Sequence, residues 1–413
     1  MCPVIFHIDV NSAFLSWESM YRIRVLHEET DYRTIPAAVT GDRQKRKGII
    51  LAKSESAKKY GIRTGEPVTD ALKKCPELVC ISPHYDFYVE NSEKFMNILK
   101  EYTPTVEKYS IDEAFCDMTE TLHLYGTAME TALKIKNRIR EELGFTVNIG
   151  ISENKLLAKM ASDFEKPDKV HTLFPEEIKE KMWPLPVSDL FFVGKASTKK
   201  LNQLGIFTIG ELAAADIGVL TAHFKSYGRV IHEYANGIYR EGVEPEPTKN
   251  KGYGNRTTLP FDVSDRETAQ LVLLSLCETV CARLRSHEVK AAVIAVELTY
   301  SDFRKESHQM SLASASNIVN EIYNISCKLF GEMWHGAPIR LMGVSAHKVV
   351  SEQEGRQMSL FEDTARFEKL SQLDKAVDNI RNKFGESAVF RASFLDSPIA
   401  PMTGELSRKK DKR

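Results

Sequence analysis

The chain has 413 residues and is 42% hydrophobic, which is enough for two to four compact domains with separate cores. Its 56 basic and 57 acidic residues leave a net charge of −1, so the composition gives no global signature of nucleic-acid binding. Seven cysteines without a C-x-x-C pair argue against a disulfide framework and a zinc ribbon, and no apolar run approaches the roughly 20 residues of a membrane span. Because the first residues also lack a basic leader, we expect a reduced, cytoplasmic protein with no membrane partner.

The N-terminal part of the sequence predicts a sheet covered by helices. Val4–Asp9 is typical of a buried strand, and Asn11 or Ser12 is expected to cap the helix that follows. Short segments follow from about residue 30 to 80. After them we expect a helix at Asp86–Tyr102, a hairpin at Val106–Met118, a helix near 127–143 and a strand at 145–151. This succession indicates an α+β domain.

The second half of the chain predicts two further domains. Residues 185–240 are helical and punctuated by glycine, and the passage 241–251, rich in Pro, Glu and Lys, is typical of a linker. Beyond it, residues 252–349 predict a β-α-β-β-α-β succession with a split βαβ sheet, in which Cys277 and Cys281 are helix-packing residues. One amphipathic helix is expected at 364–384, followed by a basic tail.

Three carboxylates are candidates for a metal site. Asp9 ends the first predicted strand, and Asp112 and Glu113 lie near the tip of the predicted hairpin. Adjacent strand residues face opposite ways, so Asp112 and Glu113 reach one centre only at a turn or bulge. Clustered carboxylates favour Mg²⁺, and two such ions assist phosphoryl transfer. The alternative is a helix cap and a solvated turn.

Basic residues near these carboxylates are candidates for phosphate binding, although lysines are more often a solvated face. They are Lys58, Lys159 and Lys166. Ser152-x-x-Lys155 matches a serine-hydrolase pattern without its companion motifs, so we interpret Ser152 as a helix cap. The stretch LFFVGKASTKKLNQLGIFTIGELA predicts two short helices around a hairpin, which either grips a DNA phosphate or forms a structural corner.

Four segments in order, HIDVNSAF, KYSIDEAFCDMT, GISENKLLAKMASDFEKPD and FVGKASTKKLNQLGI, resemble the motifs of the Y family of translesion DNA polymerases, and in particular of its bacterial DNA polymerase IV group. The resemblance extends from about residue 4 to 395. It implies a low-fidelity, DNA-directed DNA polymerase without proofreading that adds dNTPs to a primer. Its implied cofactor is Mg²⁺, two ions per active site, and its implied partners are primer-template DNA, dNTPs and the sliding clamp.

The resemblance also assigns roles to single residues. Asp9, the Val10 carbonyl, Asp112 and Glu113 would hold the metal ions, and Glu113 would be the residue usually described as catalytic. Phe14 would be the steric gate that excludes a 2′-hydroxyl. Further candidates are Lys58 and Lys166 for the nucleotide, Gly194, Lys195, Arg256 and Lys348 for DNA, and Gln357, Met358, Ser359, Leu360 and Phe361 for the clamp.

Three positions depart from the family pattern. Glu55 stands where a phosphate-contacting Tyr is usual, and Lys58 replaces the usual Arg. Asn11 replaces a common second Asp. These departures leave open a non-catalytic replication-fork protein of the same fold, whereas another palm-type phosphotransferase, such as a nucleotide cyclase, would not need the helical hairpin or the QMSLF peptide.

The implied architecture is an α+β multidomain, right-hand polymerase, which we expect to be a monomer. Its expected parts are the palm at 1–11 and 81–168, the fingers at 12–80, the thumb with a helix-hairpin-helix at 169–240, the linker at 241–251, the split-βαβ little finger at 252–350 and a C-terminal region at 351–413 with the clamp peptide and the basic tail.

Overall fold

The computed structural model describes residues 2–41, 48–246, 250–353, 364–395, 397–399 and 401–402. The chain divides into two compact units, Met1–Gly41 with Ile49–Pro247 and Asp42–Gly48 with Thr248–Arg413. The division after Pro247 falls within the passage that the sequence predicts as a linker. None of the helices in the described ranges combines the length and the apolar character that a bilayer crossing requires.

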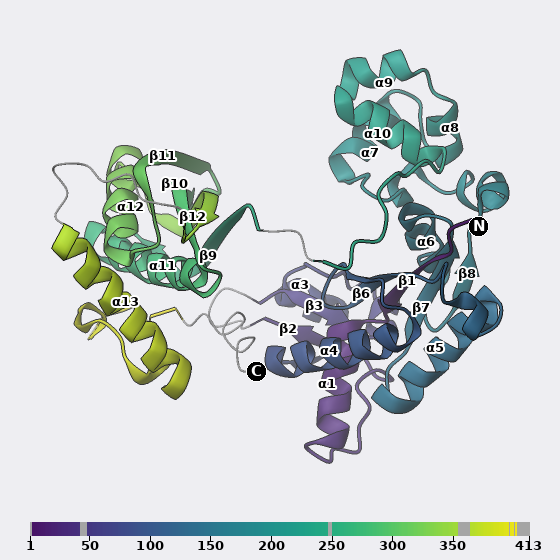
Figure 1. Ribbon diagram of the computed structural model, residues 1–413, viewed down its shortest axis with the longest axis horizontal. Helices are drawn as coiled ribbons and strands as arrows, with labels where there is room; N and C mark the ends of the chain where they lie inside the picture. The colour runs from purple at the N-terminus through teal and green to yellow at the C-terminus, as the bar shows by residue number, and fades with distance from the viewer. Residues whose placement is uncertain are drawn as a thin grey trace. The chain divides into compact units, whose positions relative to one another are not determined.

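A five-stranded sheet with the order β5-β6-β1-β7-β8 lies at the centre of the first unit (Figure 1). Its strands are β1 (Ile5–Val10), β5 (Val106–Lys108), β6 (Glu113–Asp117), β7 (Val147–Ser152) and β8 (Val170–Thr172). β1 is antiparallel to both β6 and β7, whereas β7 and β8 are parallel. The predicted first strand and hairpin are therefore confirmed, and the first strand is the middle of the sheet.

β1 is buried on both faces, and its alternate residues meet different partners because strand side chains alternate. Phe6, Ile8 and Val10 share a core with side chains of three helices. These helices are α1 (Ala13–Arg24), α4 (Tyr85–Tyr102) and α5 (Ala128–Leu143). On the other face, His7 contacts the end of helix α6 (Lys155–Ser162) and Asp9 contacts the segment after it. One face of β1 therefore builds the core and the other carries polar groups.

A second, three-stranded sheet has the order β3-β2-β4 and a small core of its own. Its elements are β2 (Ala37–Thr40), β3 (Ile50–Lys53), β4 (Val79–Ile81), α2 (Glu55–Lys59) and α3 (Val68–Lys74). Helix α1 packs against both sheets, since Trp17 belongs to the large core while Leu15 packs with Ala37 and Val39. The orientation of α1 is thus fixed from two sides.

The start of α1 differs from the sequence prediction. Ser12 has a left-handed backbone with φ 47° and makes no side-chain cap bond. Asn11 donates its side-chain N–H to Thr146 Oγ1 at 3.1 Å instead of capping the helix. The prediction of an Asn11 or Ser12 side-chain cap is therefore wrong, because the tight turn from β1 turns one side chain away and the neighbouring strand engages the other.

Helix α6 also has a different cap from the one predicted. Asn154 accepts the Leu157 N–H at 3.0 Å, whereas Ser152 lies in β7 and donates to the Leu173 carbonyl at 2.5 Å. The interpretation of Ser152 as a helix cap is therefore wrong, because strand β7 extends one residue closer to the helix than predicted and includes Ser152.

Four helices follow in the first unit and form one group in Figure 1. They are α7 (Lys195–Gln203), α8 (Ile209–Ala214), α9 (Ile217–Phe224) and α10 (Ser226–Ala235). Their core includes Leu201, Leu212 and Ile231, together with Leu157 and Met160 of α6. Because α6 contributes to this core and also borders the large sheet, it joins the helical group to the polar face of β1.

The second unit has the predicted β-α-β-β-α-β order. Its elements are β9 (Gly252–Val263), α11 (Arg266–Ser286), β10 (Val289–Tyr300), β11 (Lys305–Ser316), α12 (Val319–Met333) and β12 (Ile339–Ser351). The sheet order is β11-β10-β12-β9, and all neighbouring strands are antiparallel. β12 separates β9 from β10, which confirms the split βαβ prediction. Cys277 and Cys281 are buried on α11, as expected.

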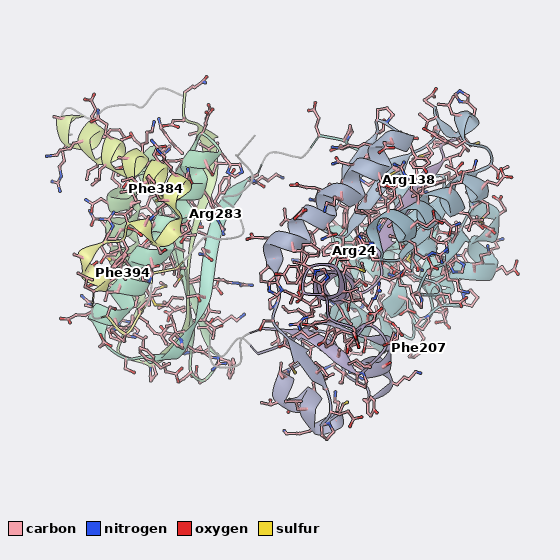
Figure 2. All side chains as sticks on the ribbon, turned by 90° about the horizontal axis from the view of Figure 1, so that it is seen from below. Arg24, Arg138, Phe207, Arg283, Phe384 and Phe394 are labelled. Atoms are coloured by element: carbon pink, nitrogen blue, oxygen red, sulfur yellow. The ribbon has the colours of Figure 1, made fainter. Side chains whose placement is uncertain are left out.

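The C-terminal helix α13 (Thr364–Phe384) has the predicted bounds and is attached to α11 by buried ion pairs. Arg285 of α11 contacts Asp378 at 2.6 Å and Asp374 at 3.4 Å, and its side chain is 7% exposed. Phe394, beyond the helix, is buried in the core of this unit, whereas Phe384 in its last turn is exposed (Figure 2). Helix α13 is therefore a packed part of the second unit.

Replacing Arg285 with Ala should lower the free energy of unfolding of the second unit by about 3 kcal/mol, because Asp374 and Asp378 would lose their buried ion pairs with Arg285. Urea unfolding followed by circular dichroism measures the loss. Lys375→Ala is the matched control, since its ion pair with Glu352 is exposed and worth less than about 1 kcal/mol. Equal losses in the two variants would contradict the structural role of the buried pair.

Candidate active site

The antiparallel register of β1 and β6 brings two of the predicted carboxylates together. Asp9 lies directly opposite Glu113, and the Val10 N–H donates to the Asp112 carbonyl at 3.0 Å. Side chains of directly opposed residues share one face of the sheet, with Cβ atoms about 5 Å apart. Asp112 lies in the turn before β6, outside the strand alternation, and accepts a hydrogen bond from Ser110 Oγ at 2.6 Å. The turn that the prediction required is present.

Lysine ammonium groups neutralise these carboxylates. Lys166 contacts Asp9 Oδ2 and, at 2.8 Å, Asp163 Oδ1. Lys159 donates to Glu113 Oε2 at 2.8 Å. With the side chains in these positions, no three Asp, Glu, His or Cys side chains in the described part of the chain are grouped closely enough to hold a metal ion. A cation at Asp9 would therefore compete with Lys166.

The two carboxyl groups differ in acidity. Burial raises the pKa of the Asp9 carboxyl to about 6, although Lys166 offsets part of this effect. Burial also opposes the ionisation of Glu113, but the influence of the neighbouring His7 and Lys159 outweighs it and holds the pKa at about 2. The negative charge of Asp9 is therefore the less well compensated of the two.

The sequence did not indicate the surroundings of Lys159. His7 lies on the same face of β1 as Asp9, and its Nε2 is 3.6 Å from Glu113 Oε2. Burial lowers the pKa of this imidazole to about 4. The rings of Tyr109 and Phe191 lie 5.5 and 5.2 Å from the Lys159 ammonium. Strand alternation could have identified His7, whereas Phe191 comes from a distant segment and had no such signal.

Phe14 lies in the first turn of α1 and is partly exposed. Its ring stacks on Tyr88 with centroids 4.8 Å apart and meets the edge of Tyr85 at 6.0 Å. The Phe14 ring is therefore packed on one side and accessible on another, so its packing does not exclude the predicted role as a steric gate.

Lys58 is not beside the carboxylates in the contacts of the described residues. It lies on α2, where its ammonium is 3.6 Å from Glu55, and both side chains are more than half exposed. Glu55 therefore pairs with Lys58, the predicted phosphate ligand. Of the two predicted nucleotide-binding lysines, only Lys166 is brought to Asp9.

The predicted DNA-binding residues lie at exposed positions. Gly194 precedes α7 and Lys195 begins it, at the side of an open depression of about 730 Å³. Arg256 on β9 is 68% exposed and 3.9 Å from Glu297, and Lys348 on β12 has a φ of 50°. The predicted clamp peptide, Gln357–Phe361, lies outside the described residues.

Comparison with known proteins places this arrangement in a family. Residues 8–163 match the impB/mucB/samB family, residues 250–360 its C-terminal domain and residues 175–206 its HHH motif. DNA polymerase IV of Clostridium acetobutylicum is 46% identical over 396 residues, which cover 96% of this chain and 99% of that protein. DNA polymerase IV 1 of Bacillus subtilis is 37% identical and covers 95% of this chain and 93% of its own length.

The chain belongs to the DNA polymerase IV group of the impB/mucB/samB family. A solved chimeric Y-family DNA polymerase shares the fold, with a TM-score of 0.73 and 22% identity over 84% of this chain and 99% of that one. The expectation of an α+β multidomain polymerase fold is confirmed. As a member of this group, the chain is a DNA-directed DNA polymerase of the translesion type, which depends on divalent metal ions and uses template DNA and dNTPs.

Proposed function

We propose that Asp9, the Val10 carbonyl, Asp112 and Glu113 hold two Mg²⁺ ions in a low-fidelity nucleotidyl-transfer site without proofreading. The cross-strand pairing of Asp9 with Glu113, next to the Val10–Asp112 backbone bond, is the observation that carries the proposal. All of these donors are oxygen atoms, which Mg²⁺ prefers. Nearby, Asn11 Oδ1 is buried without a hydrogen-bond partner among the described residues, so the region contains one further oxygen able to accept a hydrogen bond or coordinate an ion.

In the reaction, the primer 3′-hydroxyl attacks the α-phosphate of a dNTP and pyrophosphate leaves. When bound, the two ions would stabilise the attacking and leaving oxygens. The protein contributes mainly positioning and charge compensation. Displaced from both Asp9 and Asp163, the Lys166 ammonium would be available to the triphosphate, and Lys58 offers a second one if it leaves Glu55.

Phe14 supports sugar selection in this proposal. Tyr88 and Tyr85 hold its ring at the start of α1, so the aromatic face is rigid. A rigid face under the sugar excludes a 2′-hydroxyl by contact, whereas a smaller side chain leaves space for it.

For DNA we assign non-specific phosphate contacts to Gly194 and Lys195 at the start of α7 and to Arg256 and Lys348 in the second unit. The exposed glycine before α7 leaves backbone N–H groups accessible to a phosphate. We also propose that the sheets and helical group correspond to the palm, fingers, thumb and little finger at the expected bounds, that the enzyme is a cytoplasmic monomer, and that Gln357–Phe361 docks the sliding clamp.

A non-catalytic role at the replication fork is not favoured. Asn11 and Glu55, which raised that alternative, leave the Asp9–Glu113 pair intact.

Replacing Glu113 with Gln should lower kcat for Mg²⁺-dependent primer extension by at least about 100-fold, because a charge at the reacting centre is lost. Binding of primer-template, measured by fluorescence anisotropy, should persist. Glu107→Gln, which removes a carboxylate on neighbouring β5, serves as the control. Loss of DNA binding together with activity in Glu113→Gln would count against the metal-site role.

Replacing Phe14 with Ala should reduce the preference for dNTPs over rNTPs, expressed as a ratio of kcat/KM, by about 10- to 100-fold. Single-nucleotide incorporation with both sugars measures this ratio. Tyr21→Ala, two turns along the same helix, controls for loss of aromatic packing. The gate assignment is wrong if the two variants keep the same ratio as the original enzyme.

Deleting Gln357–Phe361 should leave extension of a bare primer-template intact and remove its stimulation by a loaded sliding clamp. Processivity on a primed circle, with and without clamp, gives the answer. Unchanged stimulation would dismiss the docking assignment.

A further inference from the structure

Lys159 has an unusual position for a lysine, because its side chain is almost completely buried. The residue is 8% exposed, and its ammonium lies between the Glu113 carboxylate and the rings of Tyr109 and Phe191. Burying a charge is costly unless the charge is paired, and aromatic faces add a modest attraction. The ammonium is therefore held in one place by partners from β6, the preceding turn and the segment before α7.

Hydrogen bonding determines the tautomer of the neighbouring imidazole. Ser162 donates its only hydroxyl hydrogen to the Lys159 carbonyl at 2.8 Å, so its oxygen can only accept from His7 Nδ1, which is 2.8 Å away. His7 Nδ1 therefore carries the proton, and Nε2 presents a lone pair. That lone pair faces the Lys159 ammonium at 3.5 Å. The neutral imidazole thus adds a further acceptor for the buried lysine.

We propose that Lys159 is a positioning residue for Glu113, and that His7 and the two aromatic rings hold it in place for that purpose. The inference rests on the proposed metal-binding role of Glu113. The Lys159 ammonium donates to Glu113 Oε2, and the neutral His7 ring, with Nε2 3.6 Å from the same oxygen, also contacts that ammonium. Pinning Oε2 fixes the carboxylate rotamer and leaves Oε1 as the oxygen for an ion.

The Lys159 ammonium has two opposed effects: it lowers the affinity of the site for a metal ion, and it favours catalysis. A fixed ammonium 2.8 Å from a ligand oxygen repels an incoming cation, so it lowers the affinity of the free enzyme for metal. The same ammonium keeps the carboxylate in a single orientation, which favours the reaction once the ions are bound. A lysine with a purely structural role would not produce such opposed effects.

Helix α6 provides a matched control one turn earlier. Lys155 is 7% exposed, donates to both oxygens of Glu107 at 2.9 and 2.8 Å, and lies 5.2 Å from the Phe115 ring. Its burial and chemistry therefore match those of Lys159, but its carboxylate partner is not one of the proposed metal ligands. Removing Lys155 should reproduce the structural cost of losing a buried pair and nothing more.

The test compares Lys159→Met with Lys155→Met in the full-length enzyme. Lys159→Met should lower kcat for extension at least about tenfold with little change in the KM for dNTP, since a small misplacement of a reacting group is costly. In the absence of DNA, its affinity for Mn²⁺, measured by electron paramagnetic resonance, should rise about fivefold, because a like charge has been removed. Lys159→Arg should recover part of kcat, whereas Lys155→Met should keep the original kcat and Mn²⁺ affinity.

The outcomes separate the two proposals. If Lys159→Met loses activity and Mn²⁺ affinity together, or changes neither, Lys159 is not a positioning residue. Thermal unfolding of both Met variants shows whether a loss of fold accounts for the change. Glu113→Gln, measured in the same Mn²⁺ assay, should bind the ion more weakly. If it binds Mn²⁺ as well as the original enzyme does, the proposed metal site itself is wrong, whatever Lys159 does.

Discussion

The register between β1 and β6 is the constraint on which the rest of the first unit depends. With Asp9 opposite Glu113, Phe6, Ile8 and Val10 of β1 face the core shared with α1, α4 and α5, while its polar residues His7 and Asp9 face α6 and the segment after it. A slip of one residue would exchange the two sets, because the side-chain period of a strand is two. The packing of the core and the geometry of the carboxylates therefore cannot be changed independently, and the same hydrogen-bond ladder specifies both.

Charge balance is the second feature of this region. Three lysines on or just after α6, Lys155, Lys159 and Lys166, each contact a carboxylate on the sheet. Buried ions of one sign are costly, whereas paired ions with further hydrogen bonds are tolerated. The polar face of the sheet is therefore electrically balanced by its own side chains. A metal ion that binds one of these carboxylates therefore replaces the lysine already paired with it, because that lysine already compensates the negative charge of the carboxylate.

The sequence was informative where periodicity and order carry the signal. The bounds of α13, the β-α-β-β-α-β order and the hairpin before Asp117 follow from hydrophobic patterns, and the candidate carboxylates follow from a strand end and a turn. The helix caps failed because a side chain such as Asn11 or Ser152 chooses among partners that only the folded chain supplies. The Glu55–Lys58 pair was equally inaccessible to sequence analysis, since it depends on side-chain rotamers. The contact of Phe191 with Lys159 was inaccessible because it joins residues 32 positions apart in the sequence.

Helix α1 belongs to two cores, and this limits how the protein can be recombined with its relatives. Trp17 packs beneath the large sheet and Leu15, on the same turn, packs against the small one. A chimera that exchanges the small sheet at a junction near residue 12 would carry Trp17 from one parent into a core made by the other. Junctions placed after α1 would keep the Trp17 interface within one parental sequence, and Leu15 would then have to be matched to the incoming β2. The three-stranded sheet is thus not an independent cassette, and the helix that bears Phe14 has to be inherited together with the large sheet.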